Sequence, residues 1–385
     1  MESSSLSAER LDFMNSVLKQ IYDSIVPKDE TVRQWIVKLI AVALSRQFGR
    51  EIEVRLYGSC AMELQLQHSD IDITVVLHEI SDEEKFVAWK EIYQALSRAD
   101  EFVILKEHET HRQLMVVEHK LSGTLVDVTL NNFEPAFIAK FVQISVAAHP
   151  LVKILLLTLK KWFKDQEVTK NMLPSVSSAL MGISYLQKRN YLPLLPTKEL
   201  VGDKGTQWEF FDSALSMYKD LVEQSKENKP FDNLCLGKIV YDCFVHFSTH
   251  NFREDVVSIL GGKPFKKETL KWEDHYFAIL DPFSWEDKGH KVTRNESNKL
   301  QACFKEAARI LRDDDLFFFC KPYKFDDITR RMGILGNTSQ DAEIAVVMMQ
   351  EGRAEISLIG KEIGGDELDC RDPTLPLKEL EDMKI

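Results

Sequence analysis

Two aspartates alternate with isoleucines in the segment Asp-Ile-Asp-Ile-Thr-Val-Val, which begins at Asp70. Successive side chains of a β-strand point to opposite faces, so Asp70 and Asp72 share one face while Ile71 and Ile73 share the other. Two carboxylates on one face can bind hard divalent cations, which prefer oxygen ligands. Alone, such a pair is more often a solvated strand end, and it also occurs in sugar-nucleotide transferases, so its surroundings decide its meaning.

A third carboxylate and a Gly-Ser turn complete the pattern. Asp127 lies in another strand-like segment, Thr-Leu-Val-Asp-Val-Thr-Leu, and three carboxylates can hold two metal ions, here Mg²⁺ or Mn²⁺. Gly58 and Ser59 follow a short apolar strand, twelve residues before Asp70, and can present backbone amides and a hydroxyl to phosphates. This order predicts nucleotidyl transfer, with Asp70, Asp72 and Asp127 as the catalytic residues and metal ligands.

The chain also contains five elements whose order resembles that of the noncanonical poly(A) polymerases and terminal uridylyltransferases. These template-independent enzymes extend RNA 3′ ends and belong to the DNA polymerase β-like nucleotidyltransferase superfamily. The resemblance covers most of residues 30–315. The elements lie at 58–77 (Gly-Ser and Asp-x-Asp), 126–132 (Val-Asp-Val-Thr-Leu-Asn-Asn), 151–168, 173–187, and 236–252 together with Leu-Asp-Pro-Phe at 280–283.

The resemblance implies roles for several residues outside the aspartates. Asn132 matches a neighbour of the ribose site, and Ser175 matches a serine that contacts the phosphates. Lys160 and Lys164 match lysines that face the triphosphate, and their spacing of four places them on one helix face. Together with Gly58 and Ser59, these residues are predicted to bind the nucleotide.

The sequence departs from the family pattern around the base. Val176 stands where the family usually has a tyrosine that stacks on the incoming base, and Ile138 stands where an asparagine contacts the ribose. Asp287 is nearest to the histidine that helps uridylyltransferases to select uracil, with His290 close by. A stacked base contributes roughly 1–3 kcal/mol, which Trp285 could restore. We therefore expect Val176 and Asp287 to line a looser base site that takes UTP and/or ATP and makes mixed tails.

The resemblance implies an α+β fold with two domains and the active site in the cleft between them. A catalytic domain with a mixed β-sheet is expected at 49–142. A mainly helical domain is expected at 143–320, with a poly(A) polymerase-associated region at about 206–290. The N-terminal helices within 1–48 are expected to pack on the helical domain, and 321–385 to form a partly flexible C-terminal extension.

Bulk composition is that of an ordinary globular protein. The chain has 385 residues, of which 44% are hydrophobic and 29% charged, so it has room for two cores. No apolar stretch reaches the length of a membrane span, and the first residues lack a secretory signal pattern. Six scattered cysteines favour free thiols in a reducing compartment. We predict a cytoplasmic enzyme without a membrane partner, with the nucleus left open as an alternative.

Cys243, His246 and His250 form a further group of residue types that can bind zinc. Their spacing would suit zinc, but they lie in an apolar helical segment without a second cysteine pair. These residues are therefore expected to belong to a core.

The net charge of −12 restricts how the chain can bind RNA. Broad binding to phosphates needs a basic surface, so we expect a grip on a few nucleotides of a single-stranded RNA 3′ end. An adaptor or RNA-binding protein would then supply recruitment. Two alternatives remain open: a catalytically weak interaction scaffold on the same fold, and an enzyme of the innate-sensor type that makes oligonucleotides.

Overall fold

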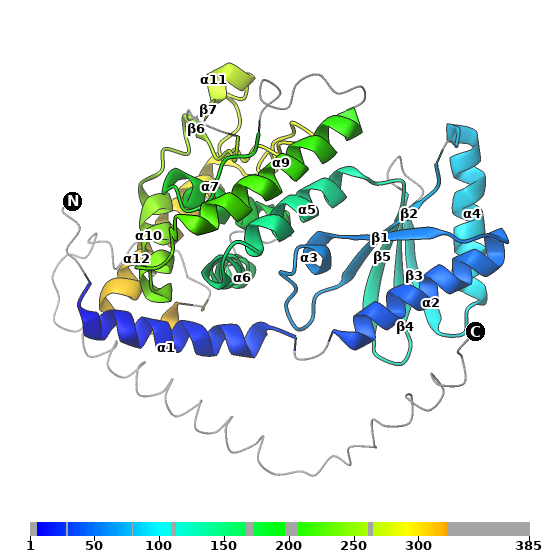
Figure 1. Cartoon of the computed structure of the whole chain (residues 1–385), viewed down its shortest axis with the longest axis horizontal. Coiled ribbons are helices and arrows are strands. Elements are labelled where there is room, and N and C mark those ends of the chain that lie inside the picture. Colours follow the sequence, from blue (N-terminus) through cyan, green and yellow to red (C-terminus); the bar gives the residue numbers. More distant parts are fainter. Residues whose placement is uncertain are drawn as a thin grey trace, which may run out of the picture. The chain divides into compact units, whose positions relative to one another are not determined.

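A mixed β-sheet and a mainly helical region make up the part of the chain that the structure describes (Figure 1). This is the predicted α+β class. The computed structural model describes residues 6–27, 30–78, 80–108, 113–166, 172–196, 207–260, 265–319 and 321.

The sheet has five strands, and their order in space differs from their order in the chain. The spatial order is β1-β2-β5-β4-β3. β2 and β5 run parallel, whereas the other neighbouring pairs are antiparallel. The strands are β1 (Glu53–Tyr57), β2 (Ile71–Val76), β3 (Phe102–His108), β4 (Leu114–His119) and β5 (Thr124–Leu130).

Strand register brings two of the predicted carboxylates side by side. Asp72 of β2 pairs with Asp127 of β5, and Tyr57 at the end of β1 pairs with Asp72. Paired residues of neighbouring strands project from the same face of a sheet, so these three side chains share one face. Asp70 directly precedes β2, which begins at Ile71.

The other face of the sheet is covered by α2 (Thr31–Phe48) and α4 (Asp82–Arg98) (Figure 1). Ile36, Ile40 and Leu44 recur at the helical period on α2 and are fully buried in one core with the apolar side chains of β2 and β5. The buried face of the sheet thus anchors β2 while leaving its carboxylate-bearing face open to the site.

The helices that follow the sheet enclose a second core, which is rich in aromatic rings. The ring of Trp162 stacks on Phe304 at 4.9 Å and meets Phe244 edge-on at 5.0 Å. The elements of this region are α5 (Glu134–Val146), α6 (Pro150–Asp165), α7 (Ser175–Lys188), α9 (Gln207–Glu227), α10 (Leu236–Thr249), β6 (Asp255–Val256), β7 (Phe265–Lys266), α11 (Lys267–Leu270), α12 (Arg294–Asp313) and a 3₁₀ turn at Leu316–Phe318.

The close approach of α6 and α7 depends on a glycine. A methyl group at Gly182 of α7 would lie 2.3 Å from Leu156 Cδ2 and 2.9 Å from Leu159 Cδ1, so any side chain there would displace both leucines. Because the core is closely packed, such a displacement is costly. Gly182 therefore sets how closely the middle of α7 packs against α6.

The first helix, α1 (Ala8–Ile25), packs on the helical region. Arg10 Nε donates a hydrogen bond to the Leu311 carbonyl at 2.8 Å, and Asn15 Oδ1 accepts one from the Gly237 amide at 2.7 Å. These bonds join the N-terminal helix to α12 and α10, which lie more than 200 residues away in the sequence.

The expectation that both N-terminal helices pack on the helical domain needs correction for α2. This helix belongs to the core of the sheet instead. The reason is physical: an amphipathic stripe requires an apolar partner but does not specify which one. The predicted boundary at residue 48 therefore divides α2 from the sheet against which it is buried.

One predicted region lies almost entirely outside the described residues. Apart from Lys321, the expected C-terminal extension at 321–385 lies outside the described residues. Within the described ones, no helix is both long and apolar enough to cross a membrane.

Candidate active site

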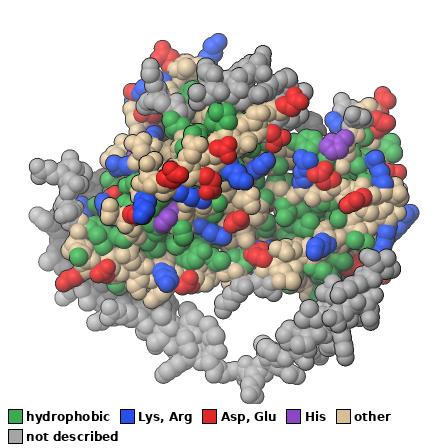
Figure 2. Space-filling model, viewed as in Figure 1, with side chains coloured by type: hydrophobic (Ala, Val, Ile, Leu, Met, Phe, Trp, Pro, Cys, Tyr) green, Lys and Arg blue, Asp and Glu red, His purple; other side chains and the backbone are tan. Residues whose placement is uncertain are grey.

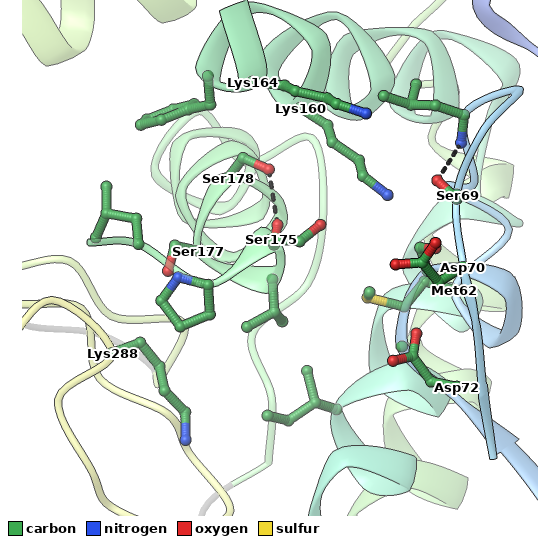
Figure 3. A pocket seen from close by; sticks show the side chains of 18 of the residues that line it. Met62, Ser69, Asp70, Asp72, Lys160, Lys164, Ser175, Ser177, Ser178 and Lys288 are labelled. Atoms are coloured by element: carbon green, nitrogen blue, oxygen red, sulfur yellow. Dashed lines mark hydrogen bonds between the residues drawn. The ribbon is translucent and has the colours of Figure 1, made fainter. Parts of the chain in front are cut away.

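A cavity of about 920 Å³ lies between the carboxylate edge of the sheet and the helices α6 and α7 (Figure 3). In the close-up, Asp70 and Asp72 reach in from the sheet side, while Lys160 and Lys164 come from α6 and Ser175 from the start of α7. The predicted residues that line it are Gly58, Ser59, Asp70, Asp72, Lys160, Lys164, Ser175 and Val176.

The three aspartates form a cluster of like charge. Burial raises the pKa of Asp72 to about 7, and the charges of Asp127 and Asp70 add to the shift. Burial also raises the pKa of Asp127, with a further contribution from Asp70. Within the described residues none of the three carboxylates forms a salt bridge. Repulsion between the ionised carboxylates makes such a cluster unfavourable unless cations bind to it. Carboxylate oxygens are the ligands that Mg²⁺ and Mn²⁺ prefer.

The side chains do not form a closed ligand shell in this conformation. Across the described residues, no three His, Cys, Asp or Glu side chains converge closely enough to surround one ion. Asp72 and Asp127 are nevertheless neighbours in register, and the charge of Asp70 acts on both. The cluster thus has the composition of a divalent-ion site.

Gly58 and Ser59 hold the carboxylate of Asp72 in place. Gly58 begins the short helix α3 (Gly58–Ala61) with φ at +62°, a conformation that favours glycine. A Cβ atom there would lie 2.0 Å from Asp72 Oδ2. The Ser59 backbone N–H donates a hydrogen bond to the same carboxylate and favours its ionised form. The Gly-Ser turn therefore shapes the metal-facing side as well as the phosphate side.

Tyr57 is a cavity residue that the sequence reasoning missed. Burial raises the pKa of its phenol to about 12, and the side chains of Thr129 and Asn132 hydrogen-bond to it. Asn132 itself does not line the cavity. Its backbone N–H donates a hydrogen bond to Thr74 Oγ1 at 2.9 Å. The signal in the sequence was position alone, since Tyr57 directly precedes the Gly-Ser turn.

The opposite wall is basic. Lys160 Nζ donates to the Leu64 carbonyl at 2.8 Å, which fixes the side chain against the segment after α3. The pKa of Lys160 is lowered to about 8, mainly by burial; Asp72 opposes this shift and Lys164 contributes to it. Lys164 lies one turn along α6 and is more exposed. The two ammonium groups therefore face the cavity with different hydration.

The first turn of α7 adds further polar groups to this wall. The first backbone N–H groups of a helix lack partners within it and attract anions. Ser175 is exposed there, and Ser177 Oγ is buried without a hydrogen-bond partner while lining the same cavity. By contrast, Ser178 Oγ donates to the Ser175 carbonyl at 3.0 Å. Ser177 is thus a second residue that the sequence pattern did not single out.

Asp287 lies apart from the other predicted residues and requires a correction. It does not line the main cavity, and its buried carboxylate accepts hydrogen bonds from the amides of Ile279 (2.8 Å) and Gly289 (2.7 Å). The other oxygen is 2.7 Å from His275 Nδ1. Because both oxygens are engaged, this geometry argues against the predicted contact with the base. The next residue, Lys288, does line the cavity.

The residues of the considered zinc site lie in the helical core. Cys243 is fully buried, and burial lowers the pKa of His246 to about 3 and that of His250 to about 4. The two imidazoles are 5.9 Å apart, and the Nε2 atom of each is buried without a hydrogen-bond partner. Neutral imidazoles packed among aromatic rings suit a structural role.

Two family models match separate parts of the chain, one containing the sheet and the other within the helical region. Residues 37–146 match a family model described as a nucleotidyltransferase domain. Residues 235–286 match one described as Cid1 family poly A polymerase. The first match contains the three aspartates and the second contains the Leu-Asp-Pro-Phe element.

Relatives in sequence are distant but extensive. Poly(A) RNA polymerase cid11 of Schizosaccharomyces pombe is 22% identical over 338 residues, which cover 83% of this chain and 68% of the relative. Terminal uridylyltransferase 7 of Homo sapiens is 22% identical over 330 residues, covering 79% of this chain and 21% of the relative. This chain therefore spans about a fifth of the human protein.

The fold matches solved structures of Cid1, described as an RNA terminal uridylyl transferase. One of them has a TM-score of 0.68 at 18% identity and covers 81% of this chain and 98% of that chain. Other matching Cid1 structures contain the short product ApU or GTP with magnesium. At this identity, the likeness establishes the fold.

Proposed function

We propose that the chain belongs to the family of RNA nucleotidyltransferases that comprises the noncanonical poly(A) polymerases and terminal uridylyltransferases, and that it adds nucleotides to RNA 3′ ends without a template. One observation carries the proposal. The carboxylates of Asp70 and Asp72 line a cavity large enough for a nucleotide, opposite a wall of lysines and helix amides, and Asp127 lies beside Asp72 in the strand register.

The carboxylate cluster is the proposed metal site. Asp70, Asp72 and Asp127 would hold two magnesium (or manganese) ions. When bound, such ions activate the attacking hydroxyl and stabilise the charge that develops on the leaving pyrophosphate. Gly58 and Ser59 support this site: Gly58 leaves room for the Asp72 carboxylate, and the Ser59 N–H opposes part of the rise in its pKa.

The opposite wall is the proposed triphosphate site. Lys160 and Lys164 supply charge-assisted hydrogen bonds to phosphate oxygens, and compact ammonium groups suit a leaving pyrophosphate. The first turn of α7 adds backbone amides and the hydroxyls of Ser175 and Ser177. With the triphosphate on this wall, its α-phosphorus is directed toward the carboxylates, where the RNA 3′ hydroxyl would attack it in line.

The base is the least specified part of the substrate. Val176 lines the cavity but has no aromatic face, and the carboxylate of Asp287 is engaged elsewhere. We therefore retain UTP and ATP as the proposed substrates, with mixed tails, and assign the looser selection to Val176. Asn132 enters as a support of Tyr57 at the ribose end of the site.

The acceptor is proposed to be a single-stranded RNA 3′ end, delivered by an adaptor or RNA-binding protein. The net charge of −12 supports this view, because an acidic chain gains little from general attraction to phosphates. The face shown in Figure 2 has acidic and basic side chains interspersed, without one broad basic surface. The cytoplasm stays the predicted compartment.

One incubation separates this proposal from its alternatives. The full chain is mixed with Mg²⁺, a labelled single-stranded RNA and each of the four nucleoside triphosphates in turn. We expect stepwise extension of the RNA with UTP or ATP and release of pyrophosphate. Oligonucleotides made without an RNA acceptor would indicate the innate-sensor type of enzyme. Intact RNA and triphosphate with all four nucleotides would indicate the scaffold.

A further inference from the structure

A second groove of about 760 Å³ adjoins the active-site cavity and shares Leu173, Pro174 and Lys288 with it. Ligand sites of roughly 300–1,000 Å³ hold a molecule the size of a nucleotide, so the main cavity already accommodates the triphosphate. The groove therefore provides room for further nucleotides next to the reacting centre. The residues that give it its character are Trp272, His275, Trp285, His290 and Lys291.

Trp285 combines an exposed side chain with a strained backbone conformation. Its side chain is 54% exposed, and its φ of +58° lies in the left-handed region, which bulky residues avoid. It sits at the tip of a loop closed by hydrogen bonds from the Trp285 amide to the Asp281 carbonyl (2.9 Å) and from the Asp281 amide to the Glu286 carbonyl (3.0 Å). Packing explains neither the exposure nor the strain, and strain of this kind is typical of ligand-binding sites.

A second aromatic surface lines the groove and is rigid. The imidazole of His275 stacks on the indole of Trp272, with ring centres 5.5 Å apart and planes 15° from parallel. His275 Nδ1 is hydrogen-bonded to Asp287, whose other oxygen is fixed by two backbone amides. Asp287 thus orients the imidazole, and a flat wall is prepared before any ligand arrives.

The groove is lined by both signs of charge, with Glu286 and Asp287 beside Lys288 and Lys291, and Lys291 is the lysine placed to meet a phosphate. Lys291 is exposed and has no acidic partner among the described residues, whereas Lys288 is paired with Asp281 (2.9 Å) and Glu286 (3.0 Å). Aromatic faces beside an available cation are the combination that proteins use to bind single-stranded nucleic acid, with bases on the rings and phosphates at the lysines.

We propose that this groove binds the last nucleotides of the single-stranded RNA acceptor, with one base on Trp285, another on the Trp272–His275 pair, and a phosphate at Lys291. The site rests on the proposed RNA-tailing function and gives it an acceptor channel. It also assigns Asp287 a role as a positioning residue, because this carboxylate holds His275.

The test measures RNA binding separately from chemistry. Fluorescence anisotropy of a labelled single-stranded 15-mer, with the full chain and no divalent metal, gives Kd without extension. Trp285→Gly and Trp285→Asn both tolerate the left-handed backbone, so their melting temperatures should stay equal to that of the wild type or rise. We expect each to raise Kd about tenfold. Lys291→Gln should raise Kd by a smaller factor and reduce its dependence on salt.

The control is Tyr93→Ala, which removes an exposed aromatic ring of α4 on the covered side of the sheet. This variant should bind RNA like the wild type. A duplex of the same sequence should bind more weakly than the single strand, because its bases are not available for stacking. With RNA saturating, the KM for the nucleoside triphosphate should be unchanged in both Trp285 variants.

Three outcomes would overturn the proposed RNA site in the groove. The first is an unchanged RNA Kd in well-folded Trp285→Gly, and the second is no binding of the 15-mer by the wild type. The third is a raised KM for the triphosphate with an unchanged RNA Kd, which would place the incoming base on Trp285 instead. Failure of the proposed function is seen separately, as no extension by the wild type with any nucleotide.

Discussion

At the scale of single residues, the site depends on a few positions where one atom more or less changes the chemistry. Gly58 leaves space for the Asp72 carboxylate, Ser59 donates to it, and Ser177 keeps a hydroxyl unpaired at the phosphate wall. None of these contacts is strong alone. Gly58 and Ser59 set the position of the Asp72 carboxylate, and Ser177 leaves a hydroxyl available on the opposite wall.

Gly58→Ala should inactivate the protein. A methyl group would meet the Asp72 carboxylate and would also strain the backbone at φ +62°, so we expect at least a 100-fold loss of extension rate and a destabilisation of about 1–3 kcal/mol. Gly49→Ala is the matched control, because Gly49 has a similar φ of +64° but open space around it. This control should lose some stability and keep its rate. Equal extension rates in both variants would show that Gly58 has no specific role in catalysis.

The pKa of Asp72 predicts how stability depends on pH without metal. Since the folded value of about 7 exceeds the ordinary value of 3.8, the folded state binds the extra proton between these limits. The contribution of this group to stability therefore falls as pH rises from about 4 to about 7 and is level above that. At pH 8, Asp72→Asn should melt a few degrees above the wild type, with no difference at pH 4.

Mg²⁺ should raise the melting temperature of the wild type at pH 8 far more than at pH 4, because only ionised carboxylates bind it. Asp72→Asn should show little of this increase. The measurement is thermal denaturation with and without Mg²⁺ at the two values of pH. A wild type that melts at the same temperature with and without Mg²⁺ at pH 8 would contradict a metal-binding cluster.

At the scale of elements, the sequence predicted which side chains share a face of a helix or strand, but not which other element that face packs against. The alternation at Asp70 and Asp72 specified a strand face, and the register of β2 with β5 then placed Asp127 beside Asp72. The partner of α2 could not be predicted, because an apolar stripe fits a sheet as well as a helix. Asp287 was misplaced for a similar reason, since its bond to His275 joins residues that no local pattern connects.

The start of α7 provides an element-level prediction. Ser177→Ala removes a buried hydroxyl that has no partner in the described residues, so it should leave stability unchanged or raise it by about 1 kcal/mol. It should raise the KM for the triphosphate about fivefold. Ser178→Ala is the neighbouring control: it loses a bond to the Ser175 carbonyl and some stability, but should keep its KM. A KM unchanged by Ser177→Ala would show that this hydroxyl does not contact the triphosphate.

At the scale of the whole molecule, charge sets how the protein meets RNA. A chain of net charge −12 that carries one aromatic groove beside its active site is suited to holding a 3′ end briefly. The proposed recruitment by another protein would supply the affinity that such a surface lacks.

Tailing by the purified chain should accordingly be distributive. With about 0.15 M salt and a trap of excess unlabelled RNA, each binding event should add only a few nucleotides, because exposed charges are screened at this ionic strength. Lowering the salt should lengthen the tails. Hundreds of nucleotides added before dissociation in the presence of the trap would remove the need for an adaptor.

The extension rate of Asp72→Asn on a labelled RNA tests the central claim most directly. The amide keeps the size of the carboxylate but loses its charge, and we expect a loss of about 10³-fold or more, equivalent to ~4 kcal/mol of barrier. Circular dichroism and the melting temperature at pH 8 should show a folded protein at least as stable as the wild type. A folded Asp72→Asn protein that extends RNA at nearly the wild-type rate would contradict the assignment of this cluster as the catalytic centre.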